Sequence, residues 1–396
     1  MPNVGSPYVV VRARTTKLKG DMNDAHRMVD DTMNKINSVF KVAAVAGAAA
    51  FVVMSKSILS LGLDFESTMK TVQAWSGATG ESLQALIDIA REMGATTEWS
   101  ANQSAEALKF LAAAGFTVEQ SIAALPQTLD LATAGQVDLA SASDITTDVL
   151  TAFGMEVEEL GRINNAFITT ASSSNTNVLM LGQSFKMVAP TAKLFGLSVE
   201  KTAAFLGTLA NAGVKAEMAG SGLNMVLLRS TKAAKMLGVD ALTPLVDILK
   251  MMKEEEWDAT QIGEAFGARQ VKTAAILMDN IGTYESLTKK IVENKTATQD
   301  LAAIIRDSLG VEIKELKSII EEQMLVVFDK IKPSLREIVT GMTDWISKND
   351  ELIKQEIHKA IDKIVTATTA TWDVLTKLKT FYDNLPEGTV GVGLIG

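Results

Sequence analysis

The hydrophobic positions in the middle of the chain recur at helical spacing, and one kind of turn separates the helices that they predict. Each turn is a glycine, an apolar residue and a short polar step into another Ala-rich helix. The turns begin at Gly115-Phe-Thr-Val-Glu, Gly154-Met-Glu-Val-Glu, Gly196-Leu-Ser-Val-Glu and, more loosely, Gly238-Val-Asp-Ala-Leu, at spacings of 39, 42 and 42 residues. A period near 40 residues indicates one supersecondary unit copied several times, so we predict an array of helical hairpins.

Glycine suits these turns because it readily adopts the left-handed conformation that ends many helices. Thr117, Glu156 and Ser198 follow two residues later, where each can cap the next helix. Gly94 opens a similar polar stretch before a helix predicted from Ala101. The predicted structural turn glycines are therefore Gly94, Gly115, Gly154, Gly196 and Gly238.

A narrow apolar stripe marks the region beyond residue 297. Its members recur every seven residues, with further apolar residues between them, at Met324, Ile331, Ile338 and Trp345. Such a stripe on a long helix needs a partner, which is either another part of this chain or the same helix of another copy. We take the four residues as a candidate self-association stripe. Pro333 is expected to bend this helix or to mark a first turn.

Two apolar segments lie near the ends of the chain. The uncharged run from Val42 to Met54 covers about 20 Å as a helix, which is short of the roughly 30 Å of a bilayer core. We interpret it as a buried or self-associating helix. Residues Gly388 to Gly396 are apolar and glycine-rich, as at the start of a truncated hydrophobic segment.

These patterns predict an all-α protein in three parts. Residues 1–63 form an N-terminal helical segment with a short apolar helix, and residues 64–290 form the repeat domain. Residues 291–396 form long amphipathic helices that end in the glycine-rich segment. The composition agrees, because hydrophobic residues make up 47% of the chain but aromatic residues only 5%, as in helix bundles.

Charge and cysteine content exclude several classes of function. The net charge of −9 argues against a mainly electrostatic grip on nucleic acid. The absence of cysteine removes disulfides and thiolate sites. The N-terminus shows no secretory signal pattern, so we expect the chain to be made and kept in the cytoplasm at first.

The candidate chemical motifs do not support an active site. His26 and His358 are the only histidines, and neither has metal-ligand or triad spacing. Gly391-Val-Gly-Leu-Ile-Gly matches a dinucleotide fingerprint by letter, but no βαβ pattern surrounds it. We therefore predict no catalytic, cofactor-binding or metal-binding residues. Trp75 and Trp99 lie beside turns and are interpreted as core residues, with anchoring of an interface as the alternative.

A series of short motifs, in order along residues 60–290, resembles the core region of phage tail tape-measure proteins. The motifs are Asp64-Phe-Glu-Ser-Thr-Met-Lys-Thr-Val-Gln-Ala, Ala90-Arg-Glu-Met-Gly-Ala-Thr-Thr-Glu-Trp-Ser-Ala, Ala105-Glu-Ala-Leu, Ala112-Ala-Ala-Gly-Phe, Leu131-Ala-Thr-Ala, Asp148-Val-Leu-Thr-Ala-Phe-Gly, Ala189-Pro-Thr-Ala, Ala210-Asn-Ala-Gly-Val and Gly220-Ser-Gly-Leu. No single motif is specific, but their order and spacing together are.

The resemblance implies a structural protein in the lumen of a phage or prophage tail, which sets tube length during assembly and is ejected at infection. It also implies other copies of itself, the tube protein, the tip or baseplate proteins and tail assembly chaperones as partners, with contact to the host membrane after ejection. The alternative hypothesis is a membrane-active, channel-forming protein, in which Val42 to Met54 and the C-terminus enter the host envelope.

Overall fold

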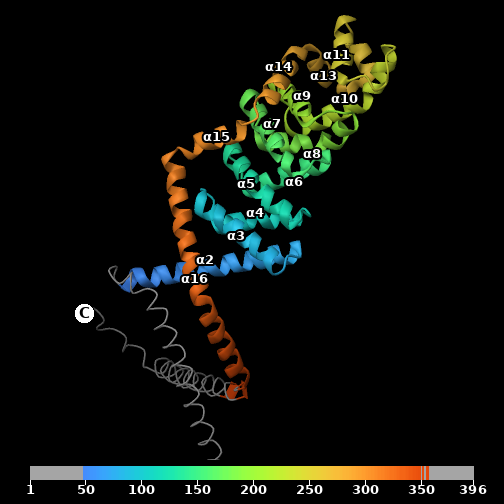
Figure 1. Ribbon diagram of the computed structural model, residues 1–396. Coiled ribbons are helices and arrows are strands. Elements are labelled where there is room, and N and C mark those ends of the chain that lie inside the picture. The colour runs from blue at the N-terminus through green and yellow to red at the C-terminus, as the bar shows by residue number, and fades with distance from the viewer. Residues whose placement is uncertain (1–47, 349, 352–353, 356–396) are drawn as a thin grey trace, which may run out of the picture. The chain divides into compact units, whose positions relative to one another are not determined.

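The computed structural model describes residues 48–348, 350–351 and 354–355, and the described part of the chain contains only helices (Figure 1). His26, His358 and residues 388–396 lie outside it, as do residues 42–47 of the N-terminal apolar run. The fifteen α-helices of the described part are α2 (Ala48–Ser76), α3 (Glu81–Thr96), α4 (Ala101–Ala113), α5 (Val118–Gly135), α6 (Leu139–Phe153), α7 (Leu160–Ser173), α8 (Val178–Leu194), α9 (Val199–Asn211), α10 (Ala216–Met236), α11 (Leu245–Glu254), α12 (Ala259–Phe266), α13 (Val271–Asp279), α14 (Ile281–Glu293), α15 (Ala297–Arg306) and α16 (Leu309–Lys348). Two short 3-10 helices, η2 (Val157–Glu159) and η3 (Ala268–Gln270), complete it. The predicted all-α class is confirmed.

The four repeated glycines end α4, α6, α8 and α10 in the same way. Gly115, Gly154, Gly196 and Gly238 have φ of 86°, 60°, 70° and 71°. At each turn the glycine N–H and the next N–H donate to the last carbonyls of the helix, as Gly154 does to Thr151 and Met155 to Leu150. This is the Schellman motif, in which the residue after the glycine packs back on the helix. The recurring apolar residue after each glycine is thereby explained.

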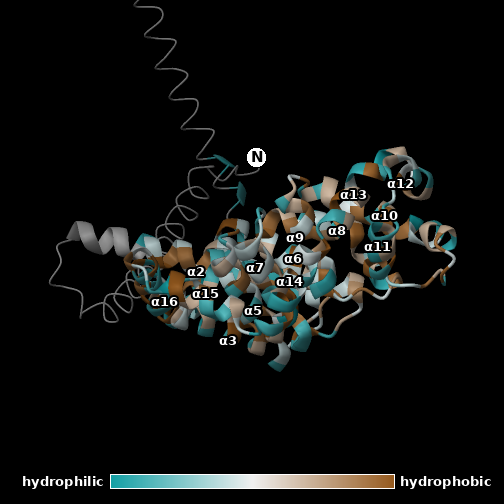
Figure 2. Ribbon diagram, turned by 90° about the horizontal axis from the view of Figure 1, so that it is seen from above, coloured by the Kyte–Doolittle hydropathy of each residue, from teal (hydrophilic) through white to brown (hydrophobic). Residues whose placement is uncertain are grey.

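The helices form two layers in which alternate helices are neighbours. In one layer α2, α4, α6, α8, α10 and α12 pack successively, and in the other α3, α5, α7 and α9 do so. Large side chains fill the space between the layers, with Leu125, Ile163, Phe167 and Phe185 almost completely buried. In Figure 2 individual helices carry both hydrophobic and hydrophilic residues, as expected for helices that bury one face. The described fold is therefore an array of helical hairpins.

Small residues let neighbouring helices of the first layer approach closely. A Cβ atom added to Gly220 of α10 would lie 2.2 Å from the carbonyl oxygen of Ser184 in α8. The Ser184 hydroxyl donates to the Ala216 carbonyl at 2.7 Å, which fixes the start of α10 on α8. The contact between α8 and α10 thus depends on the absence of a side chain at residue 220.

Gly94 differs from the other predicted turn glycines. It lies inside α3, which continues to Thr96, so the prediction that Gly94 forms the turn is wrong. A Cβ atom at Gly94 would lie 2.6 Å from the backbone nitrogen of Ala101, the first residue of α4. Glycine is required there by the close approach of α4 and not by a left-handed turn.

The helices after α12 lead the chain back along the second layer. α13 packs on α9 and α11, α14 on α9 and α7, and α15 on α7 and α5. We call residues 271–328, from α13 to the first half of α16, the return segment. It belongs with the array to one compact unit, residues 48–328. The boundaries drawn from the sequence at 63 and 290 fall inside α2 and α14, because this one core joins segments far apart in the chain.

α16 is a single 40-residue helix in which Pro333 lies without ending it. Its first half belongs to the compact unit, and its second half, from Asp329, belongs to a second unit. Among the described helices none has the length and apolar character that crossing a bilayer requires.

The close contact at Gly220 yields a test by two Gly→Ala substitutions. Gly220→Ala places its methyl group against the Ser184 backbone, so we expect the free energy of unfolding to fall by about 1–3 kcal/mol. Gly282→Ala is the control, because no atom lies within 4 Å of the added Cβ and alanine favours the helix by up to about 1 kcal/mol. Urea denaturation followed by circular dichroism measures both, and equal effects would contradict the close packing.

Candidate functional site

A cluster of five side chains joins the return segment to the array. We call it the Glu98 cluster, and its members are Glu98, Trp99, Asp130, Thr133 and Arg306. Glu98 and Trp99 lie in the turn between α3 and α4, and Asp130 and Thr133 lie on α5. Arg306 is the last residue of α15. The cluster therefore connects three parts of the chain that are up to 208 residues apart.

Ser100 positions the first two members by starting α4. Its hydroxyl accepts a hydrogen bond from the Gln103 backbone, and the Gln103 side chain accepts one from the Ser100 backbone. The preceding turn then directs the indole N–H of Trp99 to the hydroxyl of Thr133 at 2.9 Å. That hydroxyl in turn donates to Oε1 of Glu98. Local capping thus determines where Glu98 lies.

Arg306 completes the cluster from the return segment. Its Nε lies 2.9 Å from Oε2 of Glu98, and its Nη2 lies 2.8 Å from Oδ1 of Asp130. The side chain of Glu98 is only 6% exposed, and burying a carboxylate is costly unless a cation pairs with it, as Arg306 does here. Burial by itself lowers the pKa of Arg306, but the hydrogen bonds and charges of Glu98 and Asp130 outweigh burial and raise it.

Further contacts anchor the return segment to α9 and to α7. Tyr284 of α14 stacks on Phe205 of α9, with 4.0 Å between ring centroids. Asn165 of α7 donates to the Lys295 carbonyl at 2.5 Å and accepts from the Thr298 N–H at 2.9 Å. The loop between α14 and α15 is thus held by a buried amide.

α16 is fastened to the turn between α3 and α4 and to α3 itself. The Ser318 hydroxyl donates to the Gly94 carbonyl at 2.6 Å and lies 3.0 Å from the Trp99 carbonyl. Arg91 of α3 forms an ion pair with Glu322 at 2.7 Å. The first half of α16 is therefore bound over more than one helical turn.

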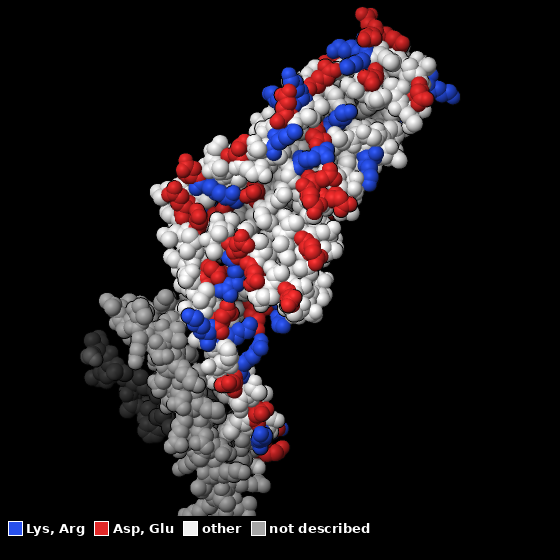
Figure 3. All heavy atoms as spheres, viewed as in Figure 1, with Lys and Arg blue, Asp and Glu red and all other residues white. Residues whose placement is uncertain are grey.

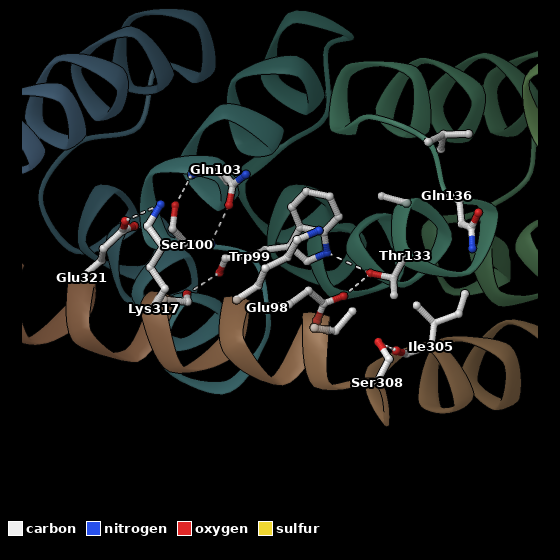
Figure 4. A pocket seen from close by; sticks show the side chains of 15 residues that line it. Glu98, Trp99, Ser100, Gln103, Thr133, Gln136, Ile305, Ser308, Lys317 and Glu321 are labelled. Carbon is white, nitrogen blue, oxygen red and sulfur yellow. Dashed lines mark hydrogen bonds and ion pairs between the residues drawn. The ribbon is translucent and has the colours of Figure 1, made fainter.

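A cavity of about 660 Å³ lies beside the Glu98 cluster (Figure 4). It is lined by Glu98, Trp99, Ser100, Gln103, Ala132, Thr133, Gln136, Val137, Ile305, Ser308, Val311, Lys314, Lys317, Ser318 and Glu321. The lining contains no histidine, and both carboxylate oxygens of Glu98 are engaged by Thr133 and Arg306. Within the described residues no three His, Asp or Glu side chains come together as metal ligands. These contacts hold the turn between α3 and α4 to α5 and to α15.

A second polar contact links successive hairpins of the array. Arg162 of α7 lies 2.9 Å from Oε1 of Glu200 in α9 and 2.6 Å from Glu159. Burial by itself raises the pKa of Glu200, but hydrogen bonds from Ser198, from its own backbone and from Arg162 lower it below the ordinary 4.5.

Charges on the surface are mixed in sign. On the face in Figure 3, acidic and basic side chains are interspersed among broad uncharged areas. This face has no extended basic patch of the kind that tracks a nucleic-acid backbone.

The structure places the four residues of the candidate self-association stripe on α16. Ile331 is 9% exposed, and Met324, Ile338 and Trp345 are half-buried. The stripe is thus not the most exposed apolar face of the helix, and its role stays a prediction. Of the two tryptophans, Trp99 packs against the core, whereas Trp75 is 54% exposed and its interpretation as a core residue was wrong.

The Glu98 cluster was not found from the sequence. Trp99 and its turn were noted, but no local pattern connects Glu98 with Arg306. The available signal was Arg306 itself, a basic residue in an apolar helical segment, and it does not specify a partner.

Comparison with known proteins identifies relatives of the array. Residues 87–304 match the family model described as "Phage-related minor tail protein". The chain is 30% identical over 305 residues to the tape measure protein of Pneumococcus phage Dp-1, covering 72% of this chain and 26% of that protein. It is 28% identical over 339 residues to the probable tape measure protein of Escherichia phage P2, and the match covers 79% of this chain and 42% of that protein. It is 23% identical over 380 residues to the probable tape measure protein of Clostridium phage phiCD119, and the match covers 88% of this chain and 40% of that protein. The chain spans less than half the length of each of these relatives. No solved structure matches it.

The Glu98 cluster predicts a large effect of removing Arg306. Arg306→Met leaves the buried Glu98 carboxylate unpaired, so we expect the free energy of unfolding to fall by about 3 kcal/mol. In the double variant Glu98→Gln/Arg306→Met the loss should be clearly smaller than the sum of the single losses. Arg269→Met is the control, because Arg269 is exposed, and it should change stability by no more than about 0.5 kcal/mol. Additive losses in the double variant would contradict the pairing.

The lowered pKa of Glu200 predicts a pH dependence. The ionised carboxylate contributes stability above pH 4.5, and this contribution is lost as pH falls through the lowered pKa. The stability difference between the wild type and Glu200→Gln should therefore be constant near neutral pH and shrink under acid conditions. Urea denaturation at a series of pH values measures it. A difference that persists at the most acid pH where both proteins fold would contradict this assignment.

Proposed function

This chain belongs to the family of phage tail tape-measure proteins, and we propose that it sets the length of a tail tube during assembly and leaves through the tube at infection. The observation that carries the proposal is the family match over α3 to α15, on a fold built of helices alone in the described part of the chain. The named relatives extend it, since each is a tape measure or probable tape measure protein.

The helical architecture supports a ruler because a helix converts residue number into length at about 1.5 Å per residue. At that rise the 40 residues of α16 cover about 60 Å. The compact unit adds little length for its number of residues, because residues 48–328 fold back on themselves through the return segment. We propose that the second half of α16, from Asp329, and the residues beyond it contribute ruler length, and that the compact unit is a head attached to the ruler.

The partners follow from the proposed role. They are other copies of the chain, the tube protein, the tip or baseplate proteins and the assembly chaperones, with contact to the host membrane after ejection. The protein would be made in the bacterial cytoplasm and would occupy the tail lumen. We propose a structural role without catalysis for this part of the protein, supported by the engaged side chains of the Glu98 cluster.

Tail length in the particle that encodes the chain tests the ruler. Deleting residues 349–385 should shorten the tail by about 55 Å, and duplicating the same 37 residues should lengthen it by about 55 Å, if they are helical as their apolar periodicity predicts. Replacing them by an unrelated helix-forming segment of equal length is the control and should leave the length unchanged. Electron microscopy of purified tails measures all three. Intact tails of unchanged length in the deletion and duplication variants would contradict the role as ruler.

A further inference from the structure

The first half of α16 presents an exposed apolar stripe. Leu309, Ile313, Leu316 and Ile320 are 70%, 58%, 58% and 47% exposed. Their spacing of four, three and four residues is that of the a and d positions of a coiled coil. Large aliphatic side chains in such a continuous row seldom face water unless they bind something. We call these four residues the α16 seam.

The seam lies on the side of α16 that faces away from the array. The residues that contact the array are Ser318, Glu322, Leu325 and Phe328, all of them buried. Ser318 and Glu322 bond to Gly94 and Arg91, and Phe328 packs against Gly62. At 3.6 residues per turn the two sets fall on nearly opposite faces of the helix. The array therefore holds the helix in place and leaves the seam open.

The identities of the seam residues indicate the kind of partner. Ile313 and Ile320 occupy the a positions, and Leu309 and Leu316 occupy the d positions. β-branched residues at a with leucine at d favour a parallel pair of helices. The helix is already formed and anchored in the monomer, so pairing does not have to order it.

The charges beside the seam also favour a parallel pair of identical helices. Glu312 occupies a g position and Lys317 the e position of the next heptad. In a parallel pair each Glu312 faces the Lys317 of the other copy, whereas an antiparallel pair brings like charges together. Lys317 is 76% exposed, and its amine lies 3.5 Å from Oε1 of Glu321 on the same helix. Its amine is therefore at the surface, where the partner can reach it.

We propose that a second copy of this chain binds in parallel through the α16 seam. This surface differs from the stripe at Met324, Ile331, Ile338 and Trp345, of which Ile331 is 9% exposed and the other three are half-buried. The pairing gives a location to the self-association that the proposed function includes, and its geometry rests on α16 alone. The test of self-association in solution and the test of tail length can therefore give different outcomes, so that either proposal can be contradicted without the other.

Sedimentation equilibrium of the full chain tests the pairing. The wild type should reach about twice its monomer mass of 42.3 kDa with rising concentration. Ile313→Glu/Leu316→Glu should remain monomeric, because it places charge in the seam while glutamate keeps helix propensity. The control Leu194→Glu/Leu242→Glu changes two residues that are 77% and 83% exposed elsewhere, and it should still dimerise. A monomeric wild type at all concentrations, or equal loss of dimer in the control, would overturn the proposal.

A charge exchange tests the orientation. Lys317→Glu should weaken the dimer roughly fivefold to tenfold, because each new carboxylate faces Glu312 of the other copy. Glu312→Lys/Lys317→Glu should restore it, since the pair is reversed. A double variant that stays as weak as Lys317→Glu would overturn the parallel arrangement.

Crosslinking gives an independent readout, because the chain has no cysteine of its own. Leu316→Cys places one thiol at d, where the two copies of a parallel pair come within disulfide distance. Mild oxidation should crosslink this variant quantitatively, and Val292→Cys, at a residue 53% exposed on α14, should stay uncrosslinked. Equal crosslinking of the two variants would overturn the proposal.

Discussion

Burial of the apolar faces of helical hairpins is the constraint on which the rest of this structure depends. A single hairpin cannot cover its own apolar face, so the hairpins stack in two layers and bury it against their neighbours. The return segment then covers the second layer from α9 back to α3. Its position is specified by a few directional contacts, among them the pair of Arg306 with Glu98, whose side chain is 6% exposed. These contacts make residues 48–328 one unit instead of an open stack.

The features that could be predicted from the sequence are those determined by residues close together along the chain. The period of about 40 residues was visible because each repeat needs a left-handed residue followed by an apolar one, as at Gly154 and Gly196. Gly94 was misinterpreted because a glycine required by close packing looks the same in sequence as a turn glycine. Gln136 also ends its helix with a positive φ of 50°, although it is not a glycine and the neighbouring Gly135 is still helical. The return segment was not foreseen because its contacts, such as Arg306 to Glu98, join residues that no local pattern connects.

The family and the structure together describe a tape-measure segment with two kinds of helix. In residues 48–328 the chain is compact, and most apolar side chains are used inside one unit. α16 begins inside the compact unit and continues to Lys348, and the proposed ruler begins in its second half. The α16 seam lies in the first half of α16, inside the compact unit, so the proposed parallel pairing would align two copies ahead of the second half of the helix.

The most direct measurement of the central claim is native-state hydrogen exchange of the full chain, resolved by peptide. If the return segment closes the array into one unit, the amides of α14, α15 and the first half of α16 should open with the same free energy as those of α5 and α7. Exchange of α14 to α16 many times faster than that of α5 and α7 would show that the return segment is a loosely attached tail, and it would contradict the account.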